Sequence, residues 1–148
     1  MIADSDQEIT LRVINGLYVE AMVLADEARA YFDDACRDTR ALMPPLTRVT
    51  FSCESLKVTT RLMHVIAWLL SQKAVFRGEG SATEPAYLGK AAVSDANTVS
   101  DLPLEAQRII LATNELYRRI GRLDVNMHRA ELYPSPALSL QSKLLYSF

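Results

Sequence analysis

The chain has 148 residues, of which 49% are hydrophobic and 23% are charged, and only five are glycine. These values are typical of one soluble globular domain and exclude a disordered or fibrous protein. The net charge of −2 argues against nucleic acid or a membrane surface as the general partner. Residues 62–76 are too short and too polar to span a membrane. The acidic start, MIADSDQE, does not resemble a signal peptide, so we expect a cytoplasmic protein.

The first predicted element is one long amphipathic helix over residues 9–42. Apolar residues recur seven apart, with a second series between them, in the order Ile14, Leu17, Ala21, Leu24, Ala28, Tyr31 and Ala35. Pro44 and Pro45 should end this helix, because proline removes a backbone donor and disfavours the helical conformation of the residue before it.

The second predicted helix covers residues 47–77 and ends near Gly78, a residue type that readily adopts the left-handed conformation after a helix. Cys36 and Cys53 are equally distant from the turn between the two helices. We therefore expect two reduced core cysteines that are neighbours across a helical hairpin. Residues 78–101 contain no sustained periodicity and are predicted to form a long loop, a kind of segment that is often functional or mobile.

The third predicted helix covers residues 102–132, with Asp101 as its N-cap and Pro103 in its first turn. Its seam combines two seven-residue series: Ile109, Leu116 and Leu123, and Thr113, Ile120 and Met127. Three such helices predict an all-α, up-down-up three-helix bundle that forms a single domain over residues 1–133.

Residues 134–148 form an apolar C-terminal tail that is too short to be an independently stable helix. The tail is expected to dock either on its own bundle or on a partner, and the sequence leaves both possibilities open. The candidate docking residues are its large apolar side chains: Leu138, Leu140, Leu144, Leu145 and Phe148.

The sequence contains no recognisable catalytic, metal or cofactor motif. The two histidines, His64 and His128, are far apart and have no zinc-binding spacing, and the chain lacks the Glu-x-x-His pairs of di-iron bundles. The GEGS stretch lacks the spacing of a phosphate-binding loop, and no GxSxG elbow occurs. We therefore predict a protein that is not an enzyme and has no cofactor.

A basic stretch lies in the third helix, where Arg118, Arg119 and Arg122 fall within about a turn and a half. A DNA-associated regulator that uses these arginines is the alternative function. Because Glu115 and Asp124 flank the stretch and no helix-turn-helix pattern is present, salt bridges or interface contacts are the favoured interpretation.

The second helix carries two apolar stripes where a three-helix bundle needs one. We expect Leu56, Met63, Ile66 and Leu70 to face the bundle. The second stripe should then be covered by another molecule, for which a second copy of the chain is favoured over internal cover. The predicted dimer or partner interface consists of Val58, Arg61, Val65, Trp68 and Val75.

Arg61 is a fixed charge at the start of the most apolar stretch of the chain. If the second and third helices are antiparallel, Arg61 should pair with Asp124 or Glu115, and Glu54 should pair with Arg122. Such pairs would fix the register of the helices more than they would add net stability.

Residues 54–79, ESLKVTTRLMHVIAWLLSQKAVFRGE, closely resemble the signature of the RcdA family, the regulators of CtrA degradation of alphaproteobacteria. Residues 18–33, the Leu102-Pro103 pair and residues 119–124 also fit. His64, Lys57 and Lys73 are mild departures, and the loop and tail match poorly. The resemblance implies a dimeric, non-enzymatic three-helix adaptor that helps deliver cell-cycle transcription regulators to the ClpXP protease. It implies as partners ClpX, a CpdR-like response regulator and a PopA-like adaptor.

Overall fold

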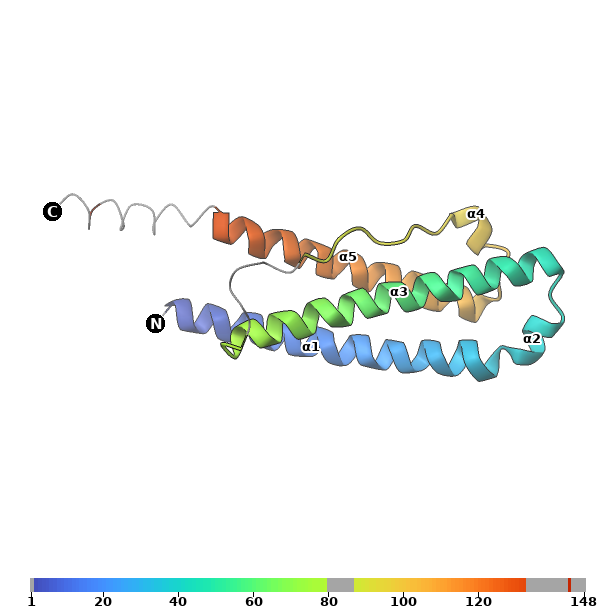
Figure 1. The fold of residues 1–148 in the computed structure, drawn as a ribbon, viewed down its shortest axis with the longest axis horizontal. Helices are drawn as coiled ribbons and strands as arrows, with labels where there is room; N and C mark the ends of the chain where they lie inside the picture. Colours follow the sequence, from blue (N-terminus) through green and yellow to red (C-terminus); the bar gives the residue numbers. More distant parts are fainter. Residues whose placement is uncertain (1, 80–86, 133–143, 145–148) are drawn as a thin grey trace.

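The computed structural model describes residues 2–79, 87–132 and 144. In chain order its elements are α1 (Ile2–Ala30), the π-helical turn η1 (Tyr31–Ala35), α2 (Arg37–Ala41), α3 (Pro45–Phe76), α4 (Ala96–Val99) and α5 (Leu104–Leu132). The long helices α1, α3 and α5 lie along one another (Figure 1). The predicted all-α class is confirmed. No helix within the described ranges has an apolar run long enough to cross a membrane.

The first helical region is not the single regular helix predicted over residues 9–42. In η1 the N–H of Cys36 donates to the carbonyl of Tyr31 at 3.0 Å, a bond five residues back that inserts one extra residue into the turn. Before this bulge, Ile14, Ala21 and Ala28 are buried, as their seven-residue spacing predicts. After it, Ala35 is exposed and Cys36 takes the buried position, because the bulge shifts the helix phase by one residue.

Helix α3 follows the predicted turn and is bounded by the residue types that the sequence indicated. Pro44 has an extended backbone with ψ 151°, and Pro45 occupies the first helical turn. Backbone N–H groups in the first turn have no acceptor within the helix, so proline costs no hydrogen bond there. At the other end Gly78 adopts φ +73°, the left-handed conformation that glycine accepts without steric strain.

The path of the chain after α3 differs from the predicted up-down-up bundle. A crossover segment, residues 87–95, runs back along the molecule in an extended conformation, so that α5 begins beside the start of α3 and runs parallel to it (Figure 1). The cross-links agree, since Arg61 contacts Thr113 and, further along both helices, Trp68 contacts Asp124. The predicted antiparallel pairing of these two helices is therefore wrong. The connection is long enough to return the chain to its starting end, which a tight turn cannot do.

The core lies between the three long helices and is closed on one side by the connection that precedes α5. Leu88 of the crossover segment, Val99 of α4 and Leu102 are all buried against the helices. The described part of the segment predicted as a loop thus contributes Leu88 and Val99 to the core. The apolar helix positions that are no more than 2% exposed are Ile14, Ala21, Phe51, Val58, Val65, Trp68, Leu69, Ala106, Ile109, Ile110, Leu116 and Ile120.

Candidate protein-interaction surface

Most residues of the two apolar stripes of α3 are placed opposite to the prediction, although Ile66 is partly buried and packs against the core as expected. Val58, Val65 and Trp68, expected to contact another molecule, are 1%, 1% and 2% exposed and lie inside the chain's own core. Leu56, Met63 and Leu70, expected to face the bundle, are 68%, 65% and 48% exposed. The reason is the parallel placement of α5 and the crossover segment, which together cover the stripe that contains Trp68. Of the predicted interface residues, only Val75 remains exposed.

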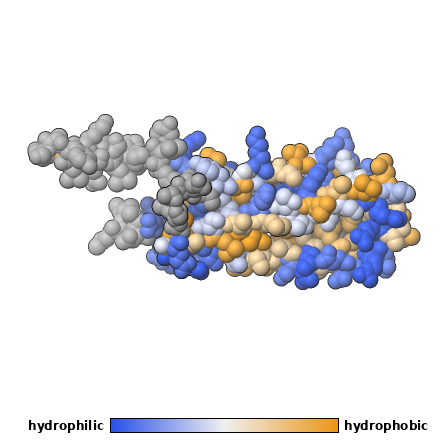
Figure 2. Space-filling view, in the orientation of Figure 1, coloured by the Kyte–Doolittle hydropathy of each residue, from blue (hydrophilic) through white to orange (hydrophobic). Residues whose placement is uncertain are grey.

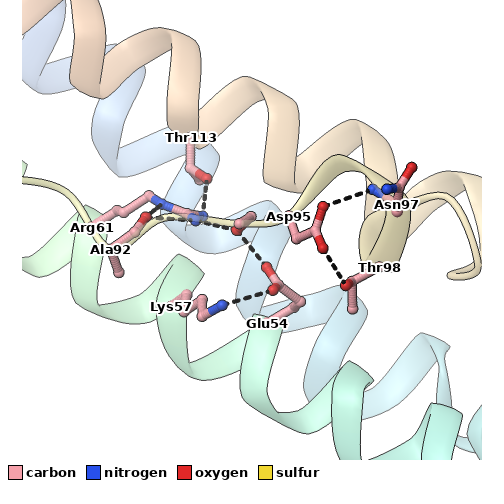
Figure 3. A network of polar contacts seen from close by, with 9 residues as sticks. Glu54, Lys57, Arg61, Ala92, Asp95, Asn97, Thr98 and Thr113 are labelled. Carbon is pink, nitrogen blue, oxygen red and sulfur yellow. Dashed lines mark hydrogen bonds and ion pairs between the residues drawn. The ribbon is translucent and has the colours of Figure 1, made fainter.

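Arg61 is 1% exposed and is the anchor of the crossover segment. Its Nε and Nη2 donate to the carbonyl of Ala92 at 3.1 and 3.0 Å, and its Nη1 donates to Thr113 Oγ1 of α5 at 3.3 Å. Figure 3 shows the guanidinium between these two partners. The predicted pairs of Arg61 with Asp124 or Glu115 are therefore wrong, because Asp124 lies further along α5 beside Trp68 and the exposed Glu115 pairs with Arg118. One guanidinium instead joins α3, α5 and the crossover segment.

Glu54 lies one side-chain layer away and completes this network. Ser94 accepts from Arg61 Nη2 and donates through its hydroxyl to Glu54 Oε2 at 2.5 Å. Lys57 Nζ lies 3.0 Å from Glu54 Oε1, as Figure 3 shows. The predicted Glu54–Arg122 pair is wrong for the same topological reason. Burial lowers the pKa of Arg61, and the nearby charge of Glu54 partly opposes that shift. The buried charge is thus balanced by a buried carboxylate.

A second buried anchor, Asp124 of α5, holds the start of the crossover segment. Its Oδ1 accepts from Trp68 Nε1 at 3.0 Å, and its Oδ2 accepts from the backbone N–H of Leu88 at 3.2 Å. Tyr117 adds two bonds from its hydroxyl, to the carbonyls of Leu88 and Gly89 at 3.0 and 3.1 Å. Burial raises the pKa of Tyr117, and the charge of Asp124 raises it further. Tyr117 is not among the residues predicted from the sequence, although a tyrosine within an apolar helical seam is a signal for a buried hydroxyl partner.

With the other stripe buried, the outer side of α3 becomes the candidate interaction surface. From residue 52 to residue 70, its exposed positions contain no Asp, Glu, Lys or Arg, and we call this set the outer α3 face: Ser52, Cys53, Leu56, Thr59, Thr60, Met63, His64, Ala67 and Leu70. Leu56, Met63 and Leu70 are seven residues apart, and the small residues Thr60 and Ala67 each follow a large one by four. This alternation is suited to close packing against another helix.

The outer α3 face continues into a shallow groove between α1 and α3. The groove has a volume of about 330 Å³, and its two walls are lined by Ala25, Ala28, Arg29, Phe32 and Asp33 on the α1 side and by Ser55, Thr59, Leu62, Met63 and Ile66 of α3. Figure 2 shows hydrophobic residues gathered along the middle of the molecule. An exposed apolar area of this kind is a typical protein-interaction site.

The arginine stretch of α5 is largely neutralised within the chain. Arg118 pairs with Glu115 on the same helix, and Arg119 pairs with Glu20 of α1. Arg122 is exposed. Two of the three cations therefore already have carboxylate partners, which argues against a continuous phosphate-binding strip. Of the two flanking acids, Glu115 forms a salt bridge with Arg118, whereas Asp124 accepts from Trp68 and Leu88.

The two cysteines differ in their exposure to solvent. Cys36 is buried but Cys53 is exposed on α3, so the expectation of two core cysteines is wrong for Cys53. No group of three or more His, Cys, Asp or Glu residues that could hold a metal occurs in the part of the chain that the structure describes.

Of the candidate tail residues, Leu144 is described and is exposed, and Leu138, Leu140, Leu145 and Phe148 lie outside the described residues.

Comparison with known proteins identifies the relatives of this chain. The family model described as "Protein of unknown function (DUF1465)" matches residues 5–147. The crystal structure of RcdA from Caulobacter crescentus CB15 is similar with a TM-score of 0.63 and 32% sequence identity, over 77% of this chain and 89% of that chain. No curated protein matches. The chain therefore belongs to the DUF1465 family and is an RcdA-like protein, as its α3 signature predicts.

Proposed function

We propose that this chain is a non-enzymatic protein-binding adaptor that helps deliver cell-cycle transcription regulators to the ClpXP protease in the cytoplasm. The observation that carries the proposal is the outer α3 face, where Leu56, Met63 and Leu70 are exposed with no charged residue among them. The similarity to RcdA supports the same role. Its partners would be ClpX, a CpdR-like response regulator, a PopA-like adaptor and the cargo proteins.

The degradation of a cargo regulator by purified ClpXP and the response-regulator partner, with and without this chain, tests the adaptor role. We expect the intact chain to accelerate cargo loss. Met63→Glu should reduce that acceleration at least about tenfold, which corresponds to about 1.4 kcal/mol of binding free energy. The reason is that partner binding would bury the new carboxylate without a counter-charge.

Leu111→Glu is the matched control, because Leu111 is a similarly exposed apolar residue on another helix, α5, and is not part of the outer α3 face. It should retain the activity of the intact chain, and circular dichroism should show both variants to be helical. If the intact chain gives no acceleration, the adaptor role is wrong. Equal losses in the two variants would instead exclude the outer α3 face as the binding surface.

Part of the same face would also serve homodimerisation. Large and small residues alternate along it at seven- and four-residue spacings, and two copies related by a two-fold axis could interlock them. Light scattering during size-exclusion chromatography should give twice the chain mass of 16.5 kDa for the intact protein. Met63→Glu should give the single-chain mass and Leu111→Glu should not. A monomeric intact chain at micromolar concentration would contradict the dimer.

A further inference from the structure

A depression lined by cations lies at the end of the molecule where α2 turns into α3. It has a volume of about 370 Å³, and its lining consists of Arg37, Arg40, Ala41, Arg48 and Ser52. Three of the five lining residues are arginines and none is acidic. This site is separate from the groove between α1 and α3 and from the arginine stretch of α5.

Local structure brings these residues together. Arg37, Arg40 and Ala41 are spaced three and four residues apart, so they share one side of α2, and Arg48 and Ser52 are likewise four apart on α3. The π-bulge of η1 sets the phase of α2, and the Pro44-Pro45 turn folds α3 back beside it. The three arginines consequently line one hollow.

None of these three arginines has an acidic partner among the residues that the structure describes. Within the described residues, Arg37, Arg40 and Arg48 have no carboxylate within 4.0 Å, although Asp33, Asp34 and Asp38 are near in sequence. The arginines that do pair are Arg12, Arg29, Arg108, Arg118 and Arg119. Like charges around one hollow repel one another, so an anion bound there would be stabilised.

Arg48 is held in place by the backbone. Its Nη2 donates to the carbonyls of Ala41 and Met43, both at 3.3 Å, at the C-terminal end of α2. These bonds fix one edge of the guanidinium and leave its other N–H groups for a ligand. Preorganisation of this kind reduces the conformational entropy that binding would otherwise remove.

We propose that Arg37, Arg40 and Arg48 form a binding site for a phosphoryl group, carried either by a phosphorylated side chain of a partner or by a small phosphate compound. A phosphoryl dianion presents three equivalent oxygens and can accept charge-assisted bonds from three guanidinium groups at once. A carboxylate offers two oxygens and one charge and would satisfy the site less completely. This site does not depend on the adaptor role.

Titration of the isotope-labelled full-length chain, followed by NMR of backbone amides and arginine Nε–H groups, tests the proposal. The probes are inorganic phosphate and a phosphoserine peptide, with sodium chloride at matched ionic strength and the unphosphorylated peptide as references. We expect saturable shifts at Arg37, Arg40, Arg48 and their neighbours with both phosphoryl probes. A peptide that binds at least ten times more tightly than inorganic phosphate would identify a phosphorylated partner, and equal affinities would identify a small phosphate compound.

Two variants with the same change of net charge separate a site from general electrostatic attraction. Arg37→Gln/Arg40→Gln should weaken phosphate binding at least tenfold. Arg77→Gln/Arg122→Gln removes two other exposed arginines and should change it less than twofold. All these positions are exposed, so the variants should fold. Non-saturable shifts, shifts matched by chloride, or equal weakening in both double variants would overturn the proposal.

Discussion

Replacement of Arg61 with alanine is expected to lower the free energy of unfolding by about 3–5 kcal/mol, the range found when one member of a buried charged pair is removed. The side chain is 1% exposed and satisfies the Ala92 carbonyl, Thr113 and Ser94 together. Its loss would leave the Ala92 carbonyl without its donor, remove one of the two bonds of Thr113 and of Ser94, and leave Glu54 with less compensation. Urea denaturation followed by circular dichroism measures the change.

Arg61→Lys and Arg122→Ala are the informative companions to this variant. Lysine retains the charge but cannot reproduce the planar fork, so it should lose stability to a smaller extent than alanine. Arg122 is exposed, and its replacement should change stability by no more than about 0.5 kcal/mol. Amide exchange should accelerate in residues 91–94 when Arg61 is replaced. A loss below about 1 kcal/mol for Arg61→Ala would contradict the anchoring role.

Replacement of Asp124 with alanine should lower the free energy of unfolding by about 2–4 kcal/mol, because two buried donors would each lose their acceptor. Those donors are Trp68 Nε1 and the backbone N–H of Leu88. Asp124→Asn should cost less, since its amide oxygen can still accept from one of them. Chemical denaturation gives the magnitude, and tryptophan fluorescence should report the changed surroundings of Trp68.

Asp26→Ala provides the comparison for this variant, because Asp26 is an exposed helical aspartate whose carboxylate lies 3.8 Å from Arg29. It should be nearly neutral, as surface ion pairs contribute little. Exchange of the Leu88 amide should become faster in Asp124→Ala and remain unchanged in Asp26→Ala. Similar stability of Asp124→Ala and Asp26→Ala would contradict the proposal that the hydrogen bonds of Asp124 hold the crossover segment in place.

The candidate interaction surface was only half predictable from the sequence. The existence of two apolar stripes on α3 follows from its residue spacing, and one stripe had to remain uncovered by a simple bundle. Which stripe that is depends on where α5 lies. Met63 and Trp68 are both apolar, and only the position of the third helix makes one of them a surface residue and the other a core residue.

The proposed phosphoryl-binding site of Arg37, Arg40 and Arg48 could not be predicted from the sequence for a different reason. The sequence places Arg37 and Arg40 close to Asp33, Asp34 and Asp38, and it does not show that these arginines lack a carboxylate partner among the described residues. The π-bulge at Tyr31–Ala35 changes the direction in which the side chains of α2 point. The Pro44-Pro45 turn then brings Arg48 of α3 to the same hollow. No periodic pattern predicts a one-residue bulge, because its effect is to break the period.

The sequence by itself determined the helical class, the approximate extent of α3 and α5, the prolines and glycine that bound α3, and the RcdA-like signature. These depend on local spacing and on residue types whose conformational preferences are strong. Only the tertiary structure decided the parallel course of α3 and α5 and, with it, the partners of Arg61, Glu54 and Asp124. The physical reason is that backbone carbonyls and N–H groups of an extended connection can form hydrogen bonds to buried polar side chains, in place of an oppositely charged residue. The sequence alone does not show where such a connection runs.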